Sequence, residues 1–150
     1  MVFAALVAGC FGAFFLTQHL KHTPTAVQSF KLTPFFSPTP SGHIKAERIS
    51  FKLARADEVT VSIVDSSGET VATLVRALPV ARYKQLSLRW NGREGMARRF
   101  ISRSTDQKRL IVPRNTGKLS PAGEYRVRVS LHGQHRAVLS PRYFTLVRSR

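Results

Sequence analysis

Apolar and polar residues alternate along much of this chain, most clearly over Glu58–Leu74. Within it, Val59–Ile63 places valine and isoleucine at every second position, which is the period of a strand with one buried face. A second apolar stretch, Val71–Val75, follows the tetrapeptide Asp65–Gly68. A short carboxylate at the first turn position and glycine at the fourth suit a type I turn with a bulge. The stretch therefore predicts a β-hairpin.

Other segments share this alternation. They are Ile49–Leu53, Leu86–Trp90, Tyr125–Leu131 and Ala137–Val147, the last interrupted at Pro141, with Val27–Leu32 as a candidate edge strand. About seven short strands with one-sided patterning predict an all-β fold, a β-sandwich. The expected core includes Phe51, Val61, Ile63, Leu88, Trp90, Tyr125 and Val127.

The N-terminal segment has a different pattern. Val2–Leu20 is nineteen residues long and contains no Lys, Arg, Asp or Glu. This length is close to the roughly 20 residues with which a helix crosses a bilayer, so the segment predicts a transmembrane helix or signal anchor. Two alternatives remain. Val7–Cys10 resembles a lipobox, in which Cys10 would be lipidated, and the segment could instead be a buried core helix.

Composition suggests how the rest of the chain is divided. Lys21–Pro40 contains four prolines and is predicted to be a linker, in which the candidate edge strand lies. Residues 41–150 would then form the sandwich, with a basic insertion around 93–118. Because the last predicted strand ends close to Arg150, the chain could also be part of a longer protein with a further domain.

The charge of the chain is strongly positive. Lys and Arg number 24 against 8 Asp and Glu, a formal charge of +16, and such a field attracts anionic polymers and membrane surfaces. Within 93–118, eight cations face only Glu94 and Asp106. The candidate contacts to an anionic partner are Arg93, Arg98, Arg99, Arg103, Lys108 and Arg109. Nucleic acid, anionic lipid headgroups and anionic wall polymers all fit this pattern, and a solvated loop is the alternative.

The sequence contains none of the usual local marks of catalysis. It has no Gly-x-Ser-x-Gly, no glycine loop for phosphate and no Cys-x-x-Cys. His132 and His135 flank a predicted turn at His132-Gly133 without a third ligand close by in the sequence, which favours surface residues over a metal site. We therefore expect neither an enzyme nor a bound cofactor or metal.

Three motifs occur together in a recognisable order. Val64–Val71, Leu88–Arg93 and Ser120–Val127 resemble the hairpin, the Trp-Asp-Gly turn and the Pro-x-Gly-x-Tyr turn of the FlgD-like Ig-like domain family, named from the bacterial flagellar hook-capping protein. The resemblance covers roughly residues 36–147 and implies an immunoglobulin-like sandwich, used in bacteria as a non-catalytic module of secreted and surface proteins. Two departures are the absence of a carboxylate from Phe36–Gly42, where members often have one, and the longer connection from Trp90 to Tyr125.

Together these features predict a membrane-anchored Ig-like interaction module outside the bacterial cytoplasmic membrane. Its partners would be the membrane, which it crosses once, and anionic envelope polymers, lipid headgroups or another envelope protein. The alternative is a basic protein that binds nucleic acid or another polyanion. The Lys and Arg residues that follow Leu20 favour a cytoplasmic domain by charge bias, whereas the family resemblance favours an external one. We expect the contact in a loop over 93–118 that the core does not need, rather than in a pocket.

Overall fold

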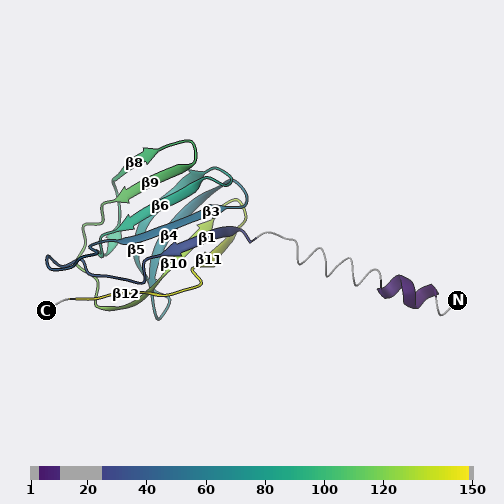
Figure 1. The fold of residues 1–150 in the computed structure, drawn as a ribbon, viewed down its shortest axis with the longest axis horizontal. Helices are drawn as coiled ribbons and strands as arrows, with labels where there is room; N and C mark the ends of the chain where they lie inside the picture. Colours follow the sequence, from purple (N-terminus) through teal and green to yellow (C-terminus); the bar gives the residue numbers. More distant parts are fainter. Residues whose placement is uncertain (1–3, 11–24, 149–150) are drawn as a thin grey trace.

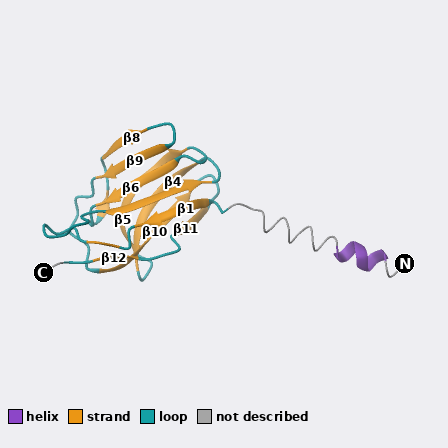
Figure 2. Cartoon of the chain, in the orientation of Figure 1, coloured by secondary structure: helices purple, strands orange, loops and turns teal. Residues whose placement is uncertain are grey.

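The computed structural model describes residues 4–10 and 25–148, and in residues 25–148 two β-sheets face each other as a sandwich (Figures 1 and 2). The predicted β-sandwich class is confirmed at this level. Residues 4–10 form a helix. Within the described residues, no helix has the length and apolar character needed to span a bilayer. Most of the predicted span, residues 2–20, lies outside the described part of the chain.

Twelve strands are described, more than the seven predicted. Their bounds are β1 Val27–Leu32, β2 Phe35–Phe36, β3 Glu47–Leu53, β4 Asp57–Asp65, β5 Thr70–Val80, β6 Gln85–Trp90, β7 Gly95–Met96, β8 Phe100–Ser104, β9 Lys108–Pro113, β10 Gly123–Leu131, β11 Arg136–Leu139 and β12 Phe144–Leu146. The candidate edge strand is confirmed as β1. The predicted last strand is divided around Pro141 into β11 and β12, because proline cannot donate to a ladder.

One sheet has five strands in the order β1-β3-β6-β9-β8, and the other has seven in the order β2-β12-β10-β4-β5-β7, with β11 also paired to β10. Most neighbouring strands run antiparallel. The pairs β2–β12, β5–β7 and β6–β9 are parallel, so both sheets are mixed. The parallel pair β6–β9 is what adds the basic segment to the five-stranded sheet.

The predicted hairpin is confirmed as β4 and β5. Gly68 has a φ of 88°, and its N–H donates to the Asp65 carbonyl at 3.1 Å. The Asp65 carboxylate accepts from the Ser67 and Glu69 N–H groups at 2.9 and 3.0 Å. The Ser67 hydroxyl and these amides hold the pKa of Asp65 below its usual range. Glycine is favoured at the last turn position because other residues are strained at this φ.

The core lies between the sheets, and every residue predicted for it is buried. Trp90 is fully buried, with its ring centroid 5.6 Å from Tyr125 and 6.0 Å from Phe144, both in edge-on geometry. Its indole N–H donates to the Arg93 carbonyl at 2.9 Å. The indole therefore fixes the end of β6 as well as filling the core.

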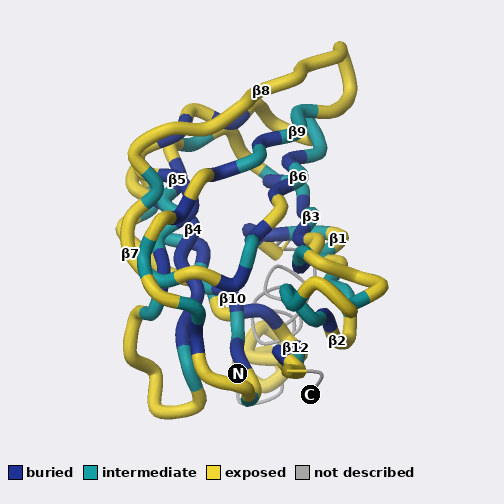
Figure 3. Tube along the Cα trace, turned by 90° about the vertical axis from the view of Figure 1, so that its left-hand side faces the viewer, coloured by how far each residue is buried: buried dark blue, intermediate teal, exposed yellow. Residues whose placement is uncertain are grey.

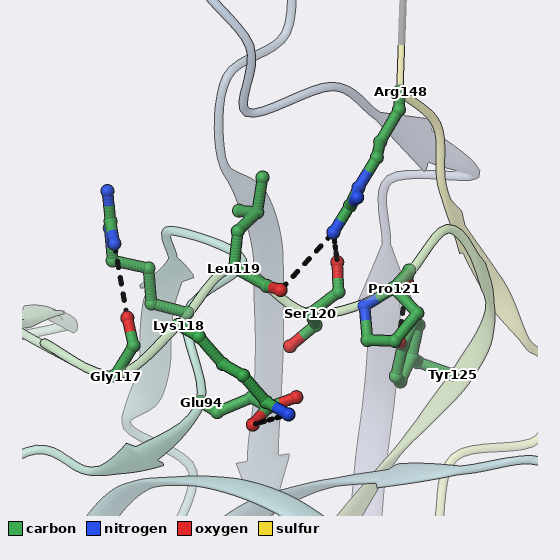
Figure 4. Close-up of polar contacts among 9 residues, drawn as sticks. Glu94, Gly117, Lys118, Leu119, Ser120, Pro121, Tyr125 and Arg148 are labelled. Atoms are coloured by element: carbon green, nitrogen blue, oxygen red, sulfur yellow. Dashed lines mark hydrogen bonds and ion pairs between the residues drawn. The ribbon is translucent and has the colours of Figure 1, made fainter.

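A hydroxyl fixes the start of β10. Tyr125 donates from its phenol to the Pro121 carbonyl at 2.6 Å, four residues upstream (Figure 4). Arg148 donates to the Leu119 and Ser120 carbonyls at 3.3 and 3.1 Å. The chain entering β10 is therefore held from both sides, which positions this strand at the centre of the seven-stranded sheet.

The segment 93–118 is not the loop that the sequence predicted. It contributes β7 to one sheet and the β8–β9 hairpin to the other. Ile111 in β9 is fully buried, and Asn115 is buried with its amide donating to the Thr73 and Gly95 carbonyls at 3.2 and 2.7 Å. The expectation that the core does not need this segment is therefore wrong, because it supplies both an apolar core residue and a link between β5 and β7.

Candidate anion-binding face

The outward side of β3 and β6 carries polar and positively charged residues, and towards β9 and β8 it also includes the apolar Leu110, Val112 and Ile101. Side chains alternate across a strand, so the burial of Ile49 and Phe51 in β3 places Arg48, Ser50 and Lys52 on the opposite side. The same alternation in β6 buries its leucines and turns its serine and arginine outward. The two strands pair antiparallel, which brings these polar sets together.

The strand register determines which outward residues are neighbours. Arg48 is the partner of Arg89, and Ser50 is the partner of Ser87. On the flanks, Lys31 of β1 lies beside Ser50, and β9 and β8 continue the rows. We call this surface the cationic face and define it by Lys31, Arg48, Lys52, Arg89, Arg103 and Lys108. The only acidic residue in these five described strands is Glu47, whose side chain is buried.

The pair Arg48–Arg89 is electrostatically unfavourable in the isolated protein. Directly opposed residues have Cβ atoms about 4.5–5.5 Å apart, and like charges there destabilise a sheet by roughly 0.2–1 kcal/mol. Both residues are exposed, and within the described part of the chain neither guanidinium has a hydrogen bond or an ion pair. The pair therefore has its donors available for an anion from solution.

Hollows in the surface follow the cationic face. One of about 390 Å³ lies over the centre of the sheet, and a second of about 340 Å³ shares Arg48, Arg89 and Thr33 with it. We call these two hollows the trough. The first is lined by Lys31, Leu32, Thr33, Arg48, Ile49, Ser50, Ser87, Leu88, Arg89, Lys108 and Leu110, and the second adds His43, Ile44, Lys45 and Ala46. The lining contains no acidic residue, so the trough is positive along its length.

Glu47 does not cancel this charge at neutral pH. Its carboxyl is fully buried, and burial raises its pKa to about 8, although a hydrogen bond from the Thr33 N–H at 2.8 Å opposes the rise. A group with this pKa is mostly protonated at pH 7. The carboxyl beneath the cationic face is therefore mostly neutral under these conditions.

The structure brings only some of the predicted contact residues together. Arg103 and Lys108 lie on the cationic face, and Lys108 also lines the trough. Arg98 and Arg99 are exposed in the segment that leads into β8. Arg98, Arg99 and Arg103 belong to the β8 side of the sheet, whereas Lys108 lines the hollow that also contains Arg48 and Arg89.

Other cations of residues 93–118 are occupied by contacts within the protein. Arg93 donates to the Gly117 carbonyl at 3.1 Å, and Lys118 lies 3.8 Å from Glu94 as an ion pair, close to the contacts of β10 (Figure 4). Arg109 donates to a carbonyl of β5 at 3.4 Å. These residues stabilise turns and strand ends, and we do not place them on the cationic face.

Four residues of the cationic face were not among the predicted contacts: Lys31, Arg48, Lys52 and Arg89. The sequence does place Arg48 and Arg89 at polar positions of two strands in which apolar and polar residues alternate. That these two residues are neighbours follows only from the pairing of β3 with β6, which short-range sequence patterns do not reveal.

The histidines at the β10–β11 turn lie on the surface, as predicted. His132 and His135 are exposed, and the His132 Nε2 atom lies 2.8 Å from the Thr60 hydroxyl. In residues 4–10 and 25–148, no group of three His, Cys, Asp or Glu side chains has a metal-binding arrangement.

No family model, curated protein or solved structure matches this chain. The resemblance to the FlgD-like Ig-like domain family therefore stays a prediction.

Proposed function

We propose that this protein is a non-catalytic interaction module that holds a linear polymer of phosphate or sulfate esters against the cationic face. The observation that carries the proposal is the pair Arg48–Arg89, two directly opposed guanidinium groups with no acceptor among the described residues. A bound oxyanion accepts hydrogen bonds from both and relieves their repulsion. The neighbouring hydroxyls of Ser50 and Ser87 add donors to the same row.

The shape of the trough favours an extended ligand over a small one. The two hollows adjoin at Arg48 and Arg89 and reach from the segment around Lys45 to Lys108 of β9. They lie open across neighbouring strands instead of enclosing a ligand, as substrate pockets usually do. A polymer with repeated anionic groups can contact several cations of such a surface at once.

Two features support an Ig-like fold of the FlgD-like type within the sandwich. The orders β1-β3-β6 and β12-β10-β4 correspond to strands A-B-E and G-F-C of immunoglobulin-like domains. The hydrogen bond from Tyr125 to Pro121 has the geometry of the tyrosine corner of that fold. The β8–β9 hairpin, which continues the first sheet beyond β6 with a parallel pair, is a departure from that pattern.

We place the module in the bacterial envelope, with residues 2–20 as a membrane anchor and the sandwich outside the cytoplasmic membrane. The support is the apolar, uncharged N-terminal run and the family resemblance. The polymer would then be an anionic wall polymer. In a topology with the sandwich inside, the same face would meet nucleic acid. Protease added to intact spheroplasts distinguishes the two, because it digests an external domain and leaves an internal one intact.

The binding test compares two double variants of the full chain with the same change in charge. Arg48→Ser/Arg89→Ser removes the central pair, and Arg76→Ser/Arg136→Ser removes two exposed cations from the other sheet. Binding of poly(glycerol phosphate), an oligonucleotide and anionic vesicles is measured across a range of salt concentrations. We expect the first variant to lose about tenfold or more in affinity for the polymer, with a shallower salt dependence, and the control to lose much less.

Equal losses in the two variants would reduce the interaction to the diffuse field of the whole protein. Tighter binding to the vesicles than to both polymers would show that the partner of the cationic face is a lipid surface and not a polymer. Neither variant is expected to melt at a lower temperature, since the four side chains are exposed, and removal of the opposed Arg48–Arg89 charges is expected to raise the melting temperature slightly.

A further inference from the structure

Strand β8 forms an open edge of the five-stranded sheet, beyond β9 (Figure 3). All five of its residues are exposed, including two large apolar ones, Phe100 and Ile101, at 44% and 46%. An edge strand offers unpaired backbone groups to another extended chain. The edge lies on the opposite side of the sheet from β1.

The hydrogen bonds on either side of β8 identify its free backbone groups. The Arg114 N–H donates to the Arg99 carbonyl at 2.9 Å, and the Thr105 N–H donates to the Lys108 carbonyl at 2.8 Å. In an antiparallel pair, alternate residues bond to the partner strand and those between them point away from it. The residues of β8 whose N–H and C=O groups point away from β9 are therefore Phe100, Ser102 and Ser104.

The remaining strand edges are blunted, including that of β5 beyond Thr73, where Ala77 has a φ of 49° and Pro79 has no N–H. In β1, Ser29 has a φ of 52° and the register with β3 shifts between Gln28 and Lys31. Strands β2 and β7 have two residues each, and β11 has four and is followed closely by Pro141. Bulges, short strands and proline are the usual protections of an edge. Strand β8 has none of them, and its register with β9 is regular.

The charges around β8 select the kind of strand that can be added. Arg98 and Arg99 precede the strand and Arg103 lies within it, whereas Asp106 at the turn is the single acidic residue of the β8–β9 hairpin. A second copy paired through β8 would bring these arginines together across the symmetry axis, in a protein with a formal charge of +16. Like charges at such a junction oppose association. An acidic strand would instead be attracted.

We propose that β8 is a docking edge for an extended segment of another protein in which acidic and apolar residues alternate. The segment adds a sixth strand to the five-stranded sheet by bonding to the backbone of Phe100, Ser102 and Ser104. Its acidic side chains lie on the side of Arg103, and its apolar side chains lie on the side of Phe100. This contact shares Arg103 with the cationic face, but it does not involve the Arg48–Arg89 pair on which the proposed function rests and does not depend on that pair.

A single substitution distinguishes backbone pairing from side-chain attraction. Ser102→Pro removes an N–H that points away from β9, and Ser102→Ala is its matched control, since both lose the hydroxyl that accepts from Arg109 at 3.2 Å. The probe is a short labelled peptide in which Val and Glu alternate, titrated into the full chain. We expect Ser102→Ala to bind within about twofold of the unmodified chain and Ser102→Pro to bind about tenfold more weakly.

Hydrogen exchange provides a second readout that needs no variant. In the unmodified chain, the peptide is expected to slow exchange at the Phe100, Ser102 and Ser104 amides.

Replacing Glu by Gln in the peptide, or Arg98, Arg99 and Arg103 by Ser in the protein, is expected to weaken peptide binding and flatten its salt dependence. The affinity of Arg48→Ser/Arg89→Ser for the peptide is expected to stay within about twofold of that of the unmodified chain. This expectation holds even if the cationic face is found not to bind a polymer.

Several results would overturn the proposal. One is that Ser102→Pro and Ser102→Ala weaken peptide binding equally, and another is that the Gln peptide binds as tightly as the Glu peptide. The others are that the peptide slows exchange at amides outside β8, and that Arg48→Ser/Arg89→Ser abolishes peptide binding. Self-association of the protein through β8 without peptide would identify a second copy as the occupant instead.

Discussion

Glu47 lies directly opposite Trp90 in the antiparallel pair of β3 and β6, and both side chains are fully buried. One carboxyl oxygen accepts from the Thr33 N–H at 2.8 Å, whereas the other has no hydrogen-bond partner among the described residues. No described cation forms an ion pair with this carboxyl. The fold therefore accommodates Glu47 as a neutral acid, consistent with a pKa raised to about 8 by burial.

This burial predicts that the protein loses stability as pH rises. The carboxyl has a reference pKa of 4.5 and a folded-state pKa of about 8, so between these values the folded state holds a proton that the unfolded state has lost. Its stabilising contribution is complete below pH 4.5 and is lost as pH rises through about 8. Within this window the free energy of unfolding falls by at most about 1.4 kcal/mol per pH unit.

The variant Glu47→Gln tests this dependence. Glutamine keeps an oxygen for the Thr33 N–H and does not ionise, so we expect it to be more stable than the native chain above pH 8 and to have a flatter profile. Denaturant unfolding from pH 4 to 9 measures the difference between the two chains. Parallel profiles would show that Glu47 does not titrate in this range.

The phenol of Tyr125 predicts a small but measurable loss in Tyr125→Phe. The substitution keeps the buried ring and removes the hydrogen bond to the Pro121 carbonyl. We expect the free energy of unfolding to fall by about 0.5–1.5 kcal/mol. Tyr143→Phe is the control, because Tyr143 is exposed and its ring is contacted by the Arg126 guanidinium. Equal effects would mean that the Tyr125 hydroxyl contributes nothing specific.

Asn115→Ala tests whether the basic segment is part of the core. The substitution removes the hydrogen bonds from the Asn115 amide to the Thr73 and Gly95 carbonyls, although the Thr73 carbonyl still accepts from the Ala97 N–H, and each lost hydrogen bond costs about 0.5–1.5 kcal/mol. Thermal unfolding should show a drop of several degrees, whereas Thr116→Ala at the exposed neighbouring position should show almost none. A segment that behaves as an independent loop would leave both variants at the native melting temperature.

Gly68→Ala tests the turn of the β4–β5 hairpin. No atom lies close to the position of an added Cβ, so the cost comes from the backbone alone, whose φ is +88°. We expect a loss of about 1–2 kcal/mol in the free energy of unfolding. Ser66→Ala in the same turn should change it far less, and denaturant titration of the pair separates backbone strain from loss of a side chain.

The strands that the sequence predicted most directly are those with a clean period of two. In Ile49–Leu53 and Tyr125–Leu131, one face is buried at every second residue and the other is polar, so local pattern and tertiary packing agree. The hairpin turn was equally predictable from the sequence, because Asp65 and Gly68 both make hydrogen bonds to groups that are close in sequence.

The strands over 93–118 could not be predicted in this way. Every residue of β8 is exposed, so no buried phase marks it as a strand, and β9 joins β6 through a parallel pair that depends on distant residues. The cationic face was missed for a related reason. Its rows combine residues of different strands, and only the register of the sheet makes Arg48 and Arg89 neighbours. The membrane anchor and the family resemblance stay predictions.

Strand β2, near the start of the sandwich, runs parallel to β12, near its end, and the two are neighbours in one sheet. Carbonyls of Pro34 and Phe36 accept from the Thr145 and Val147 N–H groups at 2.9 Å each, on either side of this short pair. When the chain is pulled from both ends, parallel neighbours slide past each other, and their hydrogen bonds carry the load together instead of opening one by one. We therefore expect this pair to raise the force needed to unfold the sandwich along the chain, which single-molecule pulling would measure.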